Sequence, residues 1–178
     1  MRDRNRRDRV WLALLLLALA TCAAAAGQGL SEVPGWPAAE DFELADLQGH
    51  RHRLADSRGR VLVLAFWASW CIPCREELPS LQRAAAQLRD RDVVILGVNL
   101  GEDPETVRRF AQQQALSLPL LLDTESRVAT AWQVRGLPTA FVVDRDGRVV
   151  LRANGARRWD DPELLRTLLA VTALAAGR

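Results

Sequence analysis

Apolar stretches alternate along the chain with amphipathic stretches, a pattern that predicts strands and helices following one another. The apolar run 61–67 is typical of a buried strand, and the segment after it has apolar residues at helical spacing from Leu78 to Leu88. The other predicted strands are 93–100, 118–122, 139–143 and 148–153. Three other helices are predicted. One begins after an N-cap at Asp103, one spans residues 125–132, and one begins after the cap at 160–163.

Residues 42–54 alternate loosely between apolar and polar side chains, which predicts an N-terminal β-hairpin that turns at Gln48-Gly49. His50 and His52 lie in this hairpin. Metal sites need three or four ligands, and no third ligand lies near them in the sequence. We therefore interpret the two histidines as an exposed pair on a strand face.

The first 26 residues predict a targeting element. Residues 1–9 are basic, and residues 10–26 are an uncharged apolar run that ends in a cleavage site for a signal peptidase. The 17 apolar residues also reach the lower limit for a membrane anchor, so both readings stay open. We interpret Cys22 as a small apolar residue of this segment, with lipidation as the alternative. The basic flank predicts that the rest of the chain lies outside the cytoplasm, in the periplasm or at the extracytoplasmic face of the inner membrane.

Composition limits the remaining part of the chain to one domain that does not bind nucleic acid. The net charge is +2, and residues 1–9 contribute +3 of it through five Arg and two Asp. What remains is close to neutral and has no basic patch with interleaved aromatic residues. We expect residues 27–40, rich in Gly, Pro and Ala, to form a linker and residues 41–176 to form the domain.

Cys71-Ile72-Pro73-Cys74 follows the strand 61–67 and opens the next helix. The first N–H groups of a helix lack partners within it, and the helix dipole favours negative charge there, so a thiolate at Cys71 is stabilised. Cys74 lies one turn further on, close enough to form a disulfide with Cys71. We interpret the pair as a redox dithiol. A static disulfide would close too small a loop to stabilise much, and a zinc site lacks a second cysteine pair.

FWASWCIPCREELP, with Gly136-Leu137-Pro138-Thr139 downstream, resembles the thioredoxin superfamily, and within it the TlpA/ResA/CcmG-type extracytoplasmic thiol:disulfide oxidoreductases. The resemblance covers residues 41–175. It implies an α/β, thioredoxin-like fold with a central mixed β-sheet flanked by helices. It also implies an N-terminal β-hairpin and an inserted helix–strand unit over residues 103–123.

The resemblance implies roles for three residues of the active-site helix. Cys71 is the nucleophile and Cys74 the buried resolving thiol. Thioredoxin carries a buried aspartate at the position of Ala65, and Glu77 takes its place here as a partly buried acid with a raised pKa that exchanges protons with Cys74. A solvated carboxylate on the helix surface is the alternative for Glu77.

The resemblance also implies a substrate-binding surface around the cysteines. Pro138 would form a cis-proline loop that faces them, with the backbone of Leu137 presented to an incoming peptide and Thr139 next to it. Trp70 would frame the groove, whereas we expect Trp67 to lie in the core.

The function implied is reduction of disulfides in substrate proteins, such as apocytochrome c or proteins of copper-site assembly. The electrons would come from a membrane thiol carrier, because the chain has no flavin or nicotinamide motif and needs no cofactor or metal. An oxidase would run the same chemistry in reverse. Two alternatives come from other classes: a peroxiredoxin-like peroxidase, and a copper-binding assembly module that uses the two cysteines and a histidine.

Overall fold

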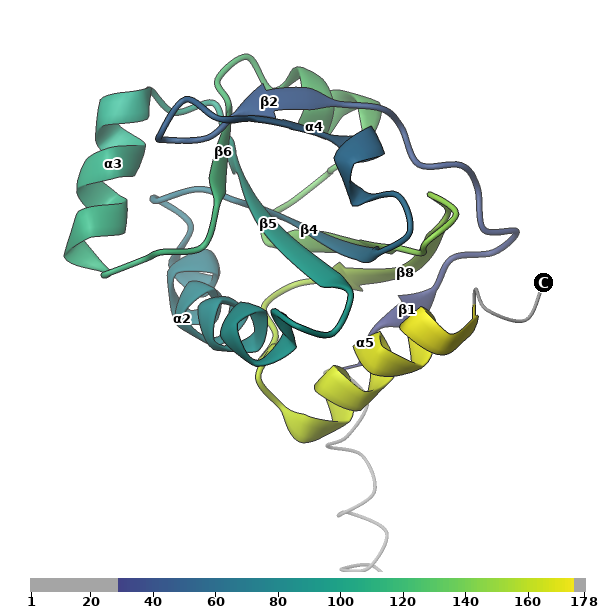
Figure 1. Ribbon diagram of the computed structural model, residues 1–178. Helices are drawn as coiled ribbons and strands as arrows, with labels where there is room; N and C mark the ends of the chain where they lie inside the picture. The colour runs from purple at the N-terminus through teal and green to yellow at the C-terminus, as the bar shows by residue number, and fades with distance from the viewer. Residues whose placement is uncertain (1–28, 175–178) are drawn as a thin grey trace, which may run out of the picture.

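The computed structural model describes residues 29–174, which form a six-stranded sheet and a separate two-stranded hairpin (Figure 1). The strands are β1 (Ser31–Glu32), β2 (Glu43–Ala45), β3 (Arg51–Arg53), β4 (Val61–Trp67), β5 (Val93–Leu100), β6 (Leu120–Asp123), β7 (Thr139–Val143) and β8 (Val149–Asn154). The helices are the 3-10 turn η1 (Leu54–Ser57), α2 (Ile72–Leu88), α3 (Pro104–Gln113), α4 (Arg127–Ala131) and α5 (Pro162–Leu174).

The targeting element predicted over residues 1–26, with Cys22, lies outside the described residues. Within residues 29–174, every helix is too short or too polar to span a bilayer.

The sheet is mixed, and β4 lies in its middle. The strand order is β1-β8-β7-β4-β5-β6, with β4 parallel to β5 and antiparallel to β7. All seven residues of β4 are buried, as expected for a strand covered on both faces. The hairpin β2–β3 and the inserted unit α3–β6 are both present, which confirms the predicted thioredoxin-like α/β fold.

Two apolar layers lie on opposite faces of β4, because successive side chains of a strand point to opposite sides. The odd-numbered residues from Val61 to Trp67 pack with α2, α3 and α5. The even-numbered residues from Leu62 to Phe66 pack with α4 and the hairpin region. Figure 1 shows α2 and α5 together on one side of the sheet, with α4 and β2 on the other. The active-site helix α2 is therefore fixed along its length by a buried face.

The prediction of a linker over residues 27–40 is partly wrong. Ser31 and Glu32 form β1, which pairs antiparallel with β8 at the edge of the sheet, and Ala38 bridges to Arg148. β1 has only two residues, both exposed, so it is too short to show an alternating apolar pattern in the sequence. This part of the segment belongs to the sheet.

The hairpin turn contains the carboxylate of Asp46, which contacts both histidines of the hairpin. Asp46 is 6% exposed, and its Oδ2 lies 3.3 Å from Nδ1 of His50 and 2.9 Å from Nε2 of His52. The prediction of an exposed histidine is therefore confirmed for His50, whose side chain is 76% exposed, and wrong for His52, whose side chain is 25% exposed. The reason is that the strand turns back far enough for Asp46 to contact both rings.

Candidate active site

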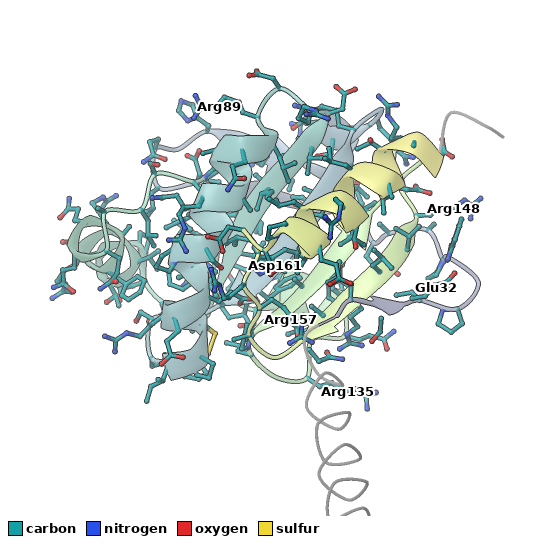
Figure 2. All side chains as sticks on the ribbon, turned by 90° about the horizontal axis from the view of Figure 1, so that it is seen from below. Glu32, Arg89, Arg135, Arg148, Arg157 and Asp161 are labelled. Carbon is teal, nitrogen blue, oxygen red and sulfur yellow. A yellow bond between two sulfur atoms is a disulfide. The ribbon has the colours of Figure 1, made fainter. Side chains whose placement is uncertain are left out.

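The junction between β4 and α2 places both cysteines at one end of the sheet. Cys71 is the N-cap of α2, and Pro73 stands in the first turn, where its missing N–H breaks no helical hydrogen bond. Sγ of Cys71 and Sγ of Cys74 are joined in a disulfide of 2.09 Å, visible at the end of α2 in Figure 2. The backbone N–H of Cys74 also donates to Sγ of Cys71 at 3.3 Å. After reduction, a thiolate at Cys71 would thus face N–H groups of the helix start.

Both cysteines are buried in the disulfide form. Cys74 is fully buried, and Cys71 keeps 6% exposure. Cys71 caps the start of α2 and belongs to the same apolar cluster as Trp67 and Cys74. Trp70 and Ile72 on either side are 69% and 67% exposed, the two large apolar side chains that the described part of the chain leaves on the surface. A partner that reaches Cys71 meets these two side chains.

Glu77 lies one turn beyond Cys74 on α2 and is 5% exposed. Its Oε1 accepts hydrogen bonds from the indole N–H of Trp159 at 2.6 Å and from the backbone N–H of Arg157 at 3.0 Å. Burial raises the pKa of this carboxyl from 4.5 to about 7, although the two hydrogen bonds and the Arg157 charge favour ionisation. A group that titrates near neutral pH can both take and return a proton.

The loop between β8 and α5 is tied to α2 just beyond Glu77. The hydroxyl of Ser80 donates to the carbonyl oxygens of Glu77 and Arg157, at 2.7 and 3.2 Å, and accepts the backbone N–H of Trp159 at 3.1 Å. Pro79 lies inside the helix, where it cannot donate to the carbonyl of the preceding turn. The Ser80 hydroxyl, one residue after this proline, fixes the loop that carries the donors to Glu77.

The peptide bond between Leu137 and Pro138 is cis, as the family resemblance implied. Pro138 precedes β7, whose first residue Thr139 pairs with Phe66 near the end of β4, so the cis-proline loop and the cysteines share one edge of the sheet. Leu137 is half-buried, and Pro138 and Thr139 are buried. The Thr139 hydroxyl donates to the carbonyl of Gly136 at 2.8 Å. Thr139 therefore holds the loop from within.

A carboxylate that the sequence analysis missed fixes the segment before Cys71. Glu102 follows β5 and accepts hydrogen bonds from the backbone N–H of Ser69 at 2.7 Å, from the Ser69 hydroxyl, and from Nδ2 of Asn99 at 2.6 Å. Its only local signal is a position just after a buried strand.

Trp67, predicted to lie in the core, is 1% exposed.

Trp159 is the second residue that the sequence analysis missed. It is fully buried, although it stands between the charged residues Arg158 and Asp160. A single large aromatic residue in such a polar stretch is a signal for a buried contact. Its partner Glu77 lies 82 residues away, so no local pattern identifies it.

The described residues give the copper-binding alternative no support. Across residues 29–174, no three His, Cys, Asp or Glu side chains are placed to hold a metal ion together. The histidines contact Asp46 in the hairpin rather than the cysteines.

The fold and the position of the disulfide define the class of this protein as a thiol:disulfide oxidoreductase with a thioredoxin-like fold. The model of the AhpC/TSA family matches residues 37–152. A thiol-disulfide oxidoreductase ResA of Geobacillus kaustophilus is 39% identical over 125 residues, which cover 70% of this chain and 72% of the relative. ResA of Bacillus subtilis is 35% identical over 117 residues, covering 66% of this chain and 65% of the relative.

A solved structure supports the same assignment. A crystal structure assigned to a DsbE thiol:disulfide interchange protein from Chlorobium tepidum superposes with a TM-score of 0.71 at 30% identity, covering 81% of this chain and 99% of that one. The chain therefore belongs to the AhpC/TSA family and, within it, to the thiol-disulfide oxidoreductases similar to ResA. It is an enzyme of thiol–disulfide exchange.

Proposed function

We propose that this oxidoreductase reduces disulfides of protein substrates outside the cytoplasm, with Cys71 as nucleophile, Cys74 as resolving thiol and Glu77 as proton carrier. The observation that carries the proposal is the Cys71–Cys74 disulfide at the start of α2, one turn from a buried carboxyl whose pKa is about 7. Such a pair can pass two electrons to a partner, and a nearby acid can move the accompanying proton.

In the first step the Cys71 thiolate attacks one sulfur of the substrate disulfide. A mixed disulfide forms, and the other substrate sulfur leaves as a thiolate that takes up a proton. Two observations support this order of attack: Cys71 caps the start of α2 between the exposed residues Trp70 and Ile72, and the N–H group of Cys74 points at its sulfur, which stabilises a thiolate there.

In the second step Cys74 attacks Cys71 and releases the second substrate thiol. Cys74 is fully buried, so burial disfavours its thiolate and a base must take the proton first. Ionised Glu77 takes that proton, becomes the neutral acid, and returns the proton to the departing substrate thiolate or to water. The balance is one substrate disulfide reduced to two thiols and one Cys71–Cys74 disulfide formed.

The substrate segment would lie against Trp70 and the backbone of Leu137, with Pro138 shaping the loop and Thr139 holding it. The exposed indole of Trp70 supports this placement, as does the register that puts the loop beside the end of β4. By similarity to ResA, the substrates would be apocytochrome c cysteines or proteins of copper-site assembly, in the periplasm or at the outer face of the inner membrane. A membrane thiol carrier would return the two electrons, and residues 1–26 would supply the signal or tether.

Cysteine variants test this order of events on an oxidised peptide that carries two cysteines separated by two other residues. We expect Cys71→Ser to abolish reduction and Cys74→Ser to accumulate a mixed disulfide with the peptide, seen by mass spectrometry under non-reducing conditions. A Cys71→Ser protein that still reduces the peptide would refute the proposal. The reductase direction also requires a midpoint potential more negative than that of the peptide disulfide.

A peroxiredoxin-like peroxidase is the second candidate, because the AhpC/TSA model is the one that matches. Consumption of hydrogen peroxide by the reduced protein distinguishes the two functions. We expect peroxide consumption to be slow compared with peptide reduction, since the chain has Trp-Cys-Ile-Pro-Cys at a helix start where a peroxiredoxin would place a single peroxidatic cysteine in a Thr-rich loop.

A further inference from the structure

Both hydrogen bonds that the described residues donate to the Glu77 carboxyl end on the same oxygen. The indole Nε1 of Trp159 lies 2.6 Å from Oε1, and the backbone nitrogen of Arg157 lies 3.0 Å from it. A protonated carboxyl has one carbonyl oxygen, which only accepts, and one hydroxyl oxygen, which donates. With two N–H groups aimed at Oε1, this atom is the carbonyl oxygen, and the proton resides on Oε2.

We propose that Trp159 is a positioning residue for the reaction: its indole N–H, together with the Arg157 amide, holds Oε1 and leaves Oε2 to exchange the proton with Cys74. The inference rests on the function proposed above, in which Glu77 takes the Cys74 proton. Trp159 touches neither substrate nor sulfur in this scheme. It determines which oxygen of the acid reacts and how strongly that oxygen binds a proton.

The backbone of the loop that carries Trp159 is held in place by several hydrogen bonds. Its backbone N–H donates to the Ser80 hydroxyl at 3.1 Å, and Ser80 stands on α2 three residues after Glu77. The loop is closed further by the guanidinium of Arg157, which donates to the carbonyl oxygens of Asn154, Gly155 and Ala156 at 2.9 to 3.1 Å. The donor and the acceptor are therefore tied to the same stretch of helix.

Packing alone does not explain this contact. The indole N–H groups of Trp67 and Trp132 are buried without a hydrogen-bond partner, so this fold tolerates buried tryptophans whose N–H is not satisfied. Among the tryptophans within residues 29–174, Trp159 is the one whose N–H reaches a buried carboxyl. Hydrogen bonds to a charged group are stronger than those between neutral groups, so this bond favours the ionised form of Glu77.

The test compares Trp159→Phe with Trp132→Phe, which removes a buried indole N–H that has no partner. The readout is the carboxyl ¹³C resonance of Glu77 during a pH titration of the oxidised protein, assigned with Glu77→Gln. We expect the midpoint of the titration to rise by about one pH unit or more in Trp159→Phe, from the lost charge-assisted bond, and to stay unchanged in Trp132→Phe. In Trp159→Phe, the midpoint of the pH dependence of the rate of mixed-disulfide resolution should move to higher pH by the same amount.

An unchanged Glu77 titration in a folded Trp159→Phe protein would overturn the inference. If that variant does not fold, the wild-type protein supplies the measurement, because the ¹H resonance of the Trp159 indole N–H must move with the Glu77 titration; an indole resonance that stays constant would overturn it equally. Neither readout uses a substrate. A wild-type protein that reduces no disulfide but shows the titration shift would contradict the proposed function and leave the Trp159 contact confirmed.

Discussion

Replacing Glu77 by glutamine tests the buried acid through the stability of the whole domain. Glutamine keeps an oxygen that can accept the N–H groups of Trp159 and Arg157, and it removes the ionisable group. Because the folded-state pKa of Glu77 is raised, the folded protein retains the proton between pH 4.5 and about 7 while the unfolded chain loses it. Stability from this group is therefore complete below pH 4.5 and is lost as the pH rises to about 7.

The size of the effect follows from the two pKa values. The span from 4.5 to about 7 corresponds to about 3 kcal/mol, at about 1.4 kcal/mol for each pH unit. Glu77 is only 5% exposed, so solvent screens little of this cost. The free energy of unfolding of Glu77→Gln, minus that of the wild type, should rise by about 3 kcal/mol between pH 4.5 and pH 8.

Urea unfolding of the oxidised protein at a series of pH values measures this difference. Glu76→Gln is the matched control, because Glu76 is the exposed neighbour on the same helix, and its difference from the wild type should stay nearly constant with pH. A constant difference for Glu77→Gln as well would mean that Glu77 ionises normally in the folded protein. In that case the assignment of Glu77 as proton carrier would lose its physical basis.

Two further predictions concern the elements that hold the site. Asp103→Ala should destabilise the protein by about 1 kcal/mol in urea unfolding, because the Asp103 carboxylate caps α3 by accepting the backbone N–H of Thr106 at 2.9 Å; an unchanged midpoint would contradict the cap. Gly97→Val should cost about 1–3 kcal/mol in the same assay, since a Cβ at Gly97 lies 3.0 Å from Leu120 and 3.2 Å from the buried indole of Trp67; an unchanged stability would show that this packing can relax.

The sequence predicted most reliably the features whose causes are local. The bounds of β4, β5 and β7 follow from continuous apolar runs, and the structure has them at the predicted residues. The helix that begins at Cys71 follows from apolar spacing and from a proline that suits its first turn. The burial of Glu77 and the cis state of Pro138 were implied only by the family resemblance, because neither leaves a pattern in the neighbouring residues.

The features that the sequence did not reveal depend on contacts between distant segments. β1 is defined by its pairing with β8, and the role of Glu102 by its bonds to Ser69, 33 residues away. Propensity and periodicity describe how a segment relates to its own neighbours, so they contain no information about such partners. Trp159 lies in a charged stretch, and its contact with Glu77, 82 residues away, is visible only in the folded structure.

The topology of the sheet explains why these distant residues meet at one site. β4 and β5 are parallel, and their carboxyl ends lie side by side, with Trp67 opposite Asn99. The cysteine loop and Glu102 therefore leave the sheet at the same end of these strands. β7 runs the other way and begins at that edge, and β8 returns and ends there, with Asn154 opposite Thr139. The loop after β8 is then in reach of both halves: the Gly155 N–H donates to the Pro138 carbonyl at 2.8 Å, and Arg157 donates to Glu77. A shift of this loop would therefore alter the cis-proline loop and the Glu77 carboxyl together. Under the function proposed above, substitutions in the loop should then change substrate binding and proton transfer at once.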